Sequence, residues 1–358
     1  MVTATIVILI TLFVASGIST PLITELIRAN GGYFKYSMLI ALPLCIGQSC
    51  AILTNWKSRF MGIIRWRYII LISLLDMISY ALNIHGLIYA GSVTYTIVHT
   101  SLTVYTAAFS MIFFDIELSR IQLIGVSVTI FGLILAIINA ESDGAEVLFG
   151  TILILIGTLI HSLTYIATEY VLIKVDDAIS PELLCSISGF IPALFYATWQ
   201  VVYTIPNYEQ VIVHSIESAH GNVDIVILCY TLLGLAAFVH STLFYFLIHS
   251  LGSTMTSSSK IIQALIIFVA SHYAFCPARK SQCLTTSKAV SFAATLLGIA
   301  MYSFTHDFES VRGYSRLKDG TGTTTTTIRN EVIVISETNN SNNTLSRQRL
   351  EYNQIGEV

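Results

Sequence analysis

Ionisable and amide side chains interrupt several long apolar stretches of the chain, at spacings that place them on common helix faces. Asp76, Tyr80 and Asn83 follow the i, i+4, i+7 pattern of one face. Lys260 and Gln263 share the face of a later, Ser- and Thr-rich stretch. Polar groups in an apolar medium are stable only when they find partners or water, so such faces are typical of a hydrated cavity.

Histidines and one glutamate add to this set. His161 and Glu169 lie on one face of another apolar stretch, and His99 lies in a Thr-rich one. These groups would allow proton coupling, with Glu169 as the candidate coupling residue. A structural interpretation stays open: Asp76 could pair with Arg67 or a helix terminus, Glu169 could lie at the membrane interface, and Lys260 could extend back to it.

Motifs of enzyme chemistry are absent from the sequence. It holds no His-x-x-x-His pair, Gly-x-Ser-x-Gly turn, P-loop or Cys-x-x-Cys. We therefore expect no catalytic residues, no metal and no cofactor. Without a nucleotide-hydrolysing motif, any transport by this chain would be driven by gradients or by exchange.

Composition decides the class of protein. Of 358 residues, 54% are hydrophobic and 11% charged, against about 25% charged in soluble domains. The mean hydropathy is +0.74, and the net charge is −3. These values exclude a soluble enzyme, a nucleic-acid binder and a secreted disulfide scaffold, and they predict an all-α integral membrane protein embedded in a lipid bilayer.

Ten stretches are long and apolar enough to be spanning helices, which need about 20 residues each. The predicted spans are Val2–Ile23, Tyr36–Leu53, Tyr68–Ala90, Val93–Phe114, Ile121–Asn139, Val147–Tyr170, Leu183–Ile205, Ile225–Ile248, Thr254–Phe275 and Ala289–Phe304.

An internal repeat relates the two halves. Gly91-Ser92 matches Gly252-Ser253 at an offset of 161, which sets His99 opposite Lys260. Five spans per half is an odd number, so the second half enters the membrane from the opposite side. This is the inverted five-plus-five plan of many secondary transporters, with substrate held near the midplane.

A second offset, of 166, relates the last span of each half. Gly125 and Gly132 then match Ser291 and Gly298. Small residues let helix backbones approach closely in lipid, so these four predict a helix-packing face.

Lys and Arg distribution gives the orientation. Twelve lie on one side of the predicted topology and five on the other, which places both termini in the cytoplasm. The expected organisation is a first five-helix repeat over 1–140, a second over 141–305 and a disordered cytoplasmic tail over 306–358. The glycosylation sequons at Asn339 and Asn342 would then stay unmodified.

Two of the six cysteines share a polar loop. Cys276 and Cys283 are expected on the non-cytoplasmic side, where an oxidising compartment would permit a disulfide. Two free thiols are the alternative.

Several short motifs, in their order, resemble the drug/metabolite transporter superfamily (EamA-like), and most closely solute carrier family 35, subfamily F. They are Trp66-Arg67-Tyr68 with Asp76, the turn into Ser92, Gln122-Leu123-Ile124-Gly125 with Gly132, and Glu169. The likeness covers about residues 66–203 well, the second half more loosely and the tail not at all.

This resemblance implies a secondary transporter of a small organic metabolite that works by alternating access. Nucleotide-sugar carriers of the family have a Gly-Ala-Leu-Asn-Lys motif whose lysine meets phosphates; here Lys260 is kept and its four companions differ. A phosphate-bearing substrate fits Lys260, whereas Asp76 and Glu169 would favour a cationic or zwitterionic one. The expected location is an endomembrane (Golgi, vacuole or lysosome) or the plasma membrane. The alternative function is a non-transporting scaffold or receptor with this fold.

Overall fold

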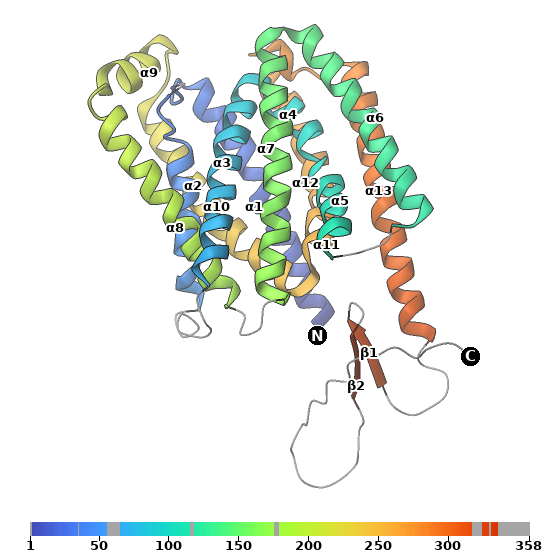
Figure 1. Ribbon diagram of the computed structural model, residues 1–358. Coiled ribbons are helices and arrows are strands. Elements are labelled where there is room, and N and C mark those ends of the chain that lie inside the picture. Colours follow the sequence, from blue (N-terminus) through green and yellow to red (C-terminus); the bar gives the residue numbers. More distant parts are fainter. Residues whose placement is uncertain are drawn as a thin grey trace.

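The chain folds as a bundle of long helices (Figure 1). The computed structural model describes residues 2–34, 36–55, 65–114, 118–174, 179–316, 324–328 and 331–335. Within these residues, eight helical segments are long and apolar enough to cross a membrane. The prediction of an all-α, multi-pass membrane protein is confirmed at this level.

The α-helices are α1 Val2–Ala29, α2 Ala41–Ser49, α3 Trp66–Ala90, α4 Ser92–His99, α5 Leu102–Phe114, α6 Arg120–Asp143, α7 Ala145–Glu169, α8 Pro181–Trp199, α9 His214–Ser218, α10 Val223–Leu251, α11 Ser253–Ser258, α12 Lys260–Phe275 and α13 Thr286–Arg316.

Two of the predicted spans contain a short irregularity, after His99 in the first and at Ser259, six residues into the second; each stays one helical segment, with helical dihedral angles at Thr100 and Ser259. The predicted span Val93–Phe114 is divided into α4 and α5, and Thr254–Phe275 into α11 and α12. The cause lies in runs of hydroxyl residues: Ser101 bonds to the carbonyl of Val98, three residues back, at 2.7 Å, and Ser259 to that of Thr256 at 2.7 Å. Such back-bonding competes with the helix ladder and bends helices.

Two other predicted spans have different bounds. The segment predicted over Tyr36–Leu53 begins only at Ala41 and continues as a 3-10 turn to Thr54, so it is shorter than the eight segments above. The first helix reaches Ala29, with Pro21 inside it. Proline cannot donate to the carbonyl four residues earlier, so the helix hydrogen-bond ladder is interrupted at that point.

A glycine turn joins the helices in each of the two matching hairpins. Gly91 (φ 87°) lies between α3 and α4, and Gly252 (φ 83°) lies between α10 and α11. Side chains disfavour this left-handed backbone, so glycine allows each chain reversal within one residue.

Helices α6 and α13 pack closely along their length (Figure 1). A Cβ on Gly125 would lie 2.6 Å from the Gly298 carbonyl oxygen, and the hydroxyl of Ser291 donates to the Gly132 carbonyl at 2.7 Å. All four predicted packing residues lie at this contact, because only small residues allow the two backbones to come so near.

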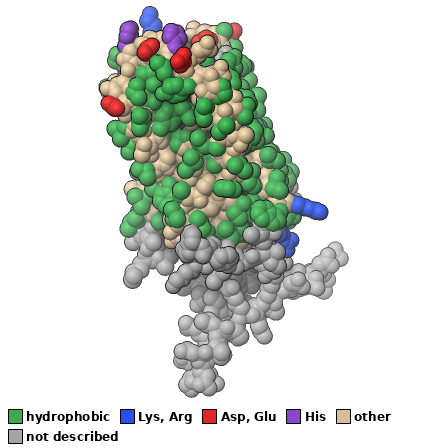
Figure 2. Space-filling view, turned by 90° about the vertical axis from the view of Figure 1, so that its left-hand side faces the viewer, with side chains coloured by type: hydrophobic (Ala, Val, Ile, Leu, Met, Phe, Trp, Pro, Cys, Tyr) green, Lys and Arg blue, Asp and Glu red, His purple; other side chains and the backbone are tan. Residues whose placement is uncertain are grey.

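Both ends of the described chain lie at one end of the bundle (Figure 1). Acidic and histidine side chains gather at the opposite end (Figure 2). Beyond Thr305, α13 continues to Arg316, and β1 (Thr324–Ile328) pairs antiparallel with β2 (Glu331–Ile335). The rest of the predicted tail, with the two sequons, lies outside the described residues.

Candidate functional site

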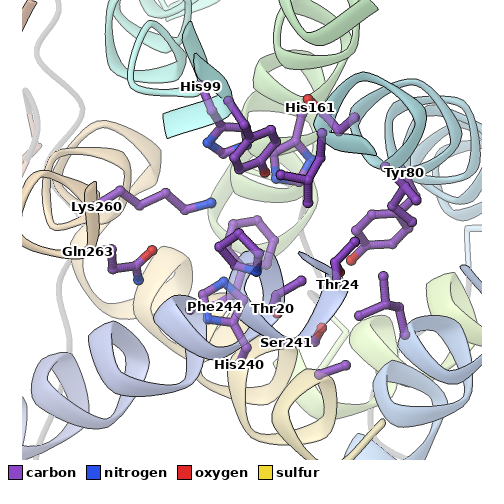
Figure 3. A pocket seen from close by; sticks show the side chains of 18 of the residues that line it. Thr20, Thr24, Tyr80, His99, His161, His240, Ser241, Phe244, Lys260 and Gln263 are labelled. Atoms are coloured by element: carbon purple, nitrogen blue, oxygen red, sulfur yellow. The ribbon is translucent and has the colours of Figure 1, made fainter. Parts of the chain in front are cut away.

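A cavity of about 130 Å³ lies in the interior of the bundle, between α1, α3, α7, α10 and the two helices that contain the irregularities (Figure 3). All seven residues predicted as substrate-binding or cavity-lining contribute to its wall. These are Asp76, Tyr80, Asn83, His99, His161, Lys260 and Gln263. The structure therefore brings them together; their contact with a substrate stays a prediction.

Lys260 supplies a cationic group to this cavity. It is the first residue of α12, directly after the irregularity at Ser259, and its side chain points into the cavity (Figure 3). Its ammonium lies 5.4 Å from the centre of the Tyr165 ring, within cation–π range. The ion pairs among the described residues do not include it. A bound anion could therefore pair with Lys260 without first displacing a carboxylate.

Three histidines surround the lysine end of the cavity. His99 is the last residue of α4, at the irregularity that matches the one before Lys260, and its ring lies 6.1 Å from that of His161. His240 stacks on Phe13 at 4.3 Å, and its Nδ1 lies 3.2 Å from the Phe13 carbonyl oxygen. These rings present both hydrogen-bonding nitrogens and aromatic faces to the cavity.

Asp76 lies at another part of the wall, in a network of neutral polar groups. Its Oδ2 accepts from the side-chain amide of Gln48 at 3.1 Å and from the hydroxyl of Tyr245 at 3.4 Å. Tyr80 donates to the other end of the Gln48 amide at 3.0 Å. The pairing of Asp76 with Arg67 considered from the sequence is not among the described ion pairs.

The interrupted part of α1 forms the remaining side. A Cβ on Gly17 would meet the Gln263 side chain, and the Gln263 amide donates to the Phe13 carbonyl at 3.0 Å. Pro21, which leaves the Gly17 carbonyl without its helical donor, also lines the cavity. Helix α1 thus contributes to the cavity wall at Gly17, whose carbonyl has no helical donor.

Positions related by the 161-residue offset face the cavity in pairs. Five such pairs have both members in its wall: Asp76 and Ala237, Tyr80 and Ser241, Asn83 and Phe244, Ile84 and Tyr245, His99 and Lys260. The sequence prediction used only the last pair. Applying the same offset to Asp76–Ile84 would have found Ser241, Phe244 and Tyr245, whereas no pattern in the sequence distinguishes His240 or Tyr95.

Glu169 lies outside this cavity. It is fully buried, and its Oε2 accepts from the backbone amide of Ser253, the first residue of α11, at 2.7 Å. In the other hairpin, Glu25 accepts in the same way from the backbone amide of Ser92, the first residue of α4, at 3.1 Å. The predicted coupling residue thus serves a helix terminus, where unpaired amides favour a carboxylate. Sequence reasoning missed Glu25 altogether.

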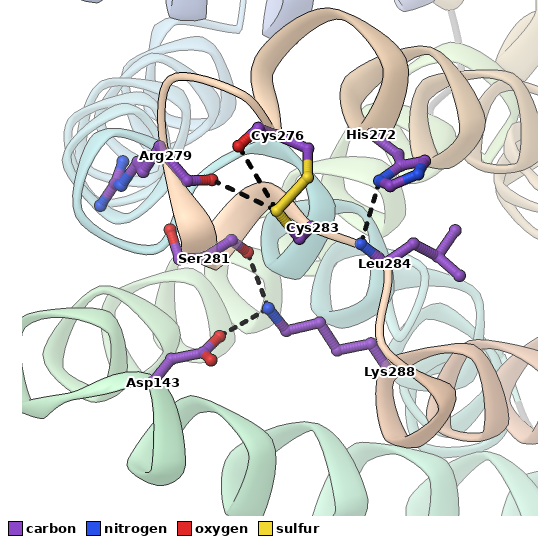
Figure 4. Close-up of a disulfide and its surroundings, with 8 residues drawn as sticks. All are labelled: Asp143, His272, Cys276, Arg279, Ser281, Cys283, Leu284 and Lys288. Carbon is purple, nitrogen blue, oxygen red and sulfur yellow. Dashed lines mark hydrogen bonds and ion pairs between the residues drawn. A yellow bond between two sulfur atoms is a disulfide. The ribbon is translucent and has the colours of Figure 1, made fainter.

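A disulfide loop covers the turn at Gly91. Cys276 and Cys283 are joined in a disulfide (Figure 4). Within this loop, Arg279 donates to the carbonyls of Ile88 and Tyr89 at the end of α3. Burial, and next the charge of Arg28, lower the pKa of the Arg279 guanidinium.

Two further contacts anchor the same loop. Gln282 donates to Glu25 at 2.6 Å and accepts from the Val93 amide at 3.1 Å. Lys288, at the start of α13, pairs with Asp143 at 2.6 Å and donates to the Ser281 carbonyl at 2.7 Å (Figure 4). The loop from the second half is therefore fixed to the first half at this end of the bundle.

Comparisons with known proteins give no family. No family model matches the chain, and no curated protein matches it. A solved structure described only as "Crystal structure of protein" is similar with a TM-score of 0.49 and 15% sequence identity, over 82% of this chain and 98% of that chain.

Proposed function

We propose that the chain is a secondary transporter of a small organic metabolite, driven by a gradient or by exchange, with its substrate held in the cavity that Lys260 faces. The observation that carries this proposal is which residues of the two halves form the cavity wall. Equivalent positions of the two halves meet there, beside the short irregularities of two helices. In transporters built from structural repeats, substrate sites typically lie where the repeats meet.

The proposal includes ten crossings arranged as two inverted five-helix repeats. The matching glycine turns, the two carboxylate-capped helix termini and the paired cavity positions support it. The two crossings beyond the eight long segments would be Ala41–Thr54, which is short, and α13, which packs along α6. Both termini would then be cytoplasmic, in an endomembrane or the plasma membrane.

Membership of the drug/metabolite transporter superfamily, near solute carrier family 35 subfamily F, is part of the same proposal and rests on the motifs given above. One of those motifs, Gln122-Leu123-Ile124-Gly125 with Gly132, contains the glycines that allow α6 and α13 to pack closely. No enzymatic activity is proposed.

The test is uptake into proteoliposomes of the purified protein, screening metabolites with and without a pH gradient. Saturable uptake is expected for wild type and at least a tenfold loss for Lys260→Ala, because the cavity loses its cation. Lys280→Ala is the matched control, since that lysine is exposed outside the cavity.

Absence of uptake for every metabolite, from protein shown to be folded, would favour the scaffold or receptor instead. In that case Lys260→Ala and His99→Ala would leave the activity of the protein unchanged, while substitutions in the α6–α13 contact would abolish it.

A further inference from the structure

Asp76 is the one carboxylate in the wall of the cavity, as far as the structure describes it. Only 2% of its surface is exposed, and no basic side chain among the described residues lies within ion-pair distance. Its hydrogen bonds come from an amide and a phenol, which are neutral groups. Keeping an unpaired charge in such surroundings is costly, and a proton removes that cost.

The groups packed around Asp76 do not supply a competing charge. The titratable ones that it influences electrostatically come from five helices: Cys45 of α2, Tyr80 of α3, Tyr165 of α7, Cys185 and Tyr196 of α8, and Tyr245 of α10. Thiols and phenols are ordinarily neutral near pH 7. His161 and Lys260 also face the cavity, neither of them in an ion pair with Asp76.

Building on the proposed function, we propose that the cavity binds a proton on Asp76 together with a small organic monoanion near Lys260, and that the two cross the membrane together in a one-to-one, electroneutral symport. The proton comes from the water of the cavity on one side. It adds to the Asp76 carboxylate and is released as a proton on the other side, so no bond of the substrate changes.

Charge balance is the reason for coupling. With the histidines neutral, the empty cavity carries Lys260 positive and Asp76 negative, and the cavity loaded with both proton and anion is also neutral. A cavity with only one of the two carries a net charge, which is unfavourable within a membrane. Proton and anion therefore favour each other's binding, and this linkage is reciprocal.

Asp76 also has the position that coupling requires. It lines the cavity directly, and it is bonded to Tyr245 of α10, while Tyr80 and Gln48 extend its network to α3 and α2. Glu169, the last residue of α7, does not line the cavity, and its carboxylate accepts from the first amide of α11. The structure thus assigns the coupling proton to Asp76 in place of the residue expected from the sequence.

The first experiment detects the proton without any substrate. Infrared spectra of the purified protein in vesicles, recorded across the physiological pH range, should contain a titrating carboxyl band that is lost in Asp76→Asn and present at a shifted frequency in Asp76→Glu. A band unchanged in Asp76→Asn, or absent from wild type, would overturn the assignment. If Asp76→Asn does not fold, Asp76→Glu decides, because lengthening the side chain must shift the band.

The second experiment measures transport of two named organic monoanions, radiolabelled lactate and nicotinate. Asp76→Asn should lose pH-gradient-driven accumulation at least tenfold yet keep counterflow exchange, because its neutral amide resembles the protonated acid. Glu169→Gln should keep both. In wild type, a membrane potential imposed with potassium and valinomycin should leave accumulation unchanged.

The outcomes separate the two proposals. Two results would overturn the symport but not the proposed transporter function. One is wild-type uptake that does not depend on the pH gradient; the other is a loss of coupling in Glu169→Gln but not in Asp76→Asn. Absence of uptake and counterflow for every metabolite tested would overturn the proposed transporter function, and the symport with it.

Discussion

Glu25→Ala should destabilise the protein strongly, because that carboxylate joins both halves at one end of the bundle. The residue is 1% exposed, and its oxygens accept from Ser92, Gln282 and Arg28 at 3.1, 2.6 and 2.7 Å. Leaving the Ser92 and Gln282 donors buried without this acceptor costs about 1–3 kcal/mol each. The half-exposed Arg28 pair adds about 0–1 kcal/mol. Together these contributions predict a loss of about 2–7 kcal/mol in the free energy of unfolding.

Denaturant unfolding of the purified protein in mixed micelles measures this loss. Glu25→Gln should cost only about 1 kcal/mol, because one oxygen remains to accept. Glu141→Ala, at the exposed end of α6, is the matched control and should change stability by less than about 0.5 kcal/mol. Equal stability of Glu25→Ala and Glu141→Ala would refute the reasoning.

Two further substitutions test packing and the covalent link. Gly125→Ala should lower the free energy of unfolding by about 1–3 kcal/mol, because its Cβ would lie 2.6 Å from a backbone oxygen of α13. Gly234→Ala is the control: the nearest atom to its Cβ would be 3.5 Å away, so it should be neutral or stabilising in the same unfolding assay. Cys276→Ser should cost about 2 kcal/mol, as expected for a disulfide that spans seven positions. A reductant should destabilise wild type to the same extent and leave Cys276→Ser unchanged; equal sensitivity of both would count against the link.

Much of the site could be predicted from the sequence because a few simple patterns determine which side chains share a helix face or match between the halves. Helical spacing was enough to place Asp76, Tyr80 and Asn83 on one face, and the glycine turns were enough to set His99 opposite Lys260. Both patterns depend on the backbone alone, so packing does not alter them.

Other features depend on contacts between distant segments, which no local pattern contains. Glu169 and Glu25 each bond to an amide more than sixty residues away, so their role at helix termini became visible only once the helices were packed. The irregularities at Ser101 and Ser259 arise from side chains that compete with the backbone, and hydropathy does not record this. His240 faces the cavity from an apolar helix, where a packing role is equally common.

The disulfide loop makes the two ends of the bundle unequal. It fixes the turn at Gly91 through hydrogen bonds of Arg279 and Gln282, whereas the described residues near Gly252 include no disulfide-bonded loop. In the alternating-access cycle proposed above, these contacts would stabilise the state that is shut at the Gly91 end, and each 1.4 kcal/mol gives about a tenfold bias in population. Reduction of the disulfide would loosen the loop that makes these contacts and shift the population of the empty carrier away from that state.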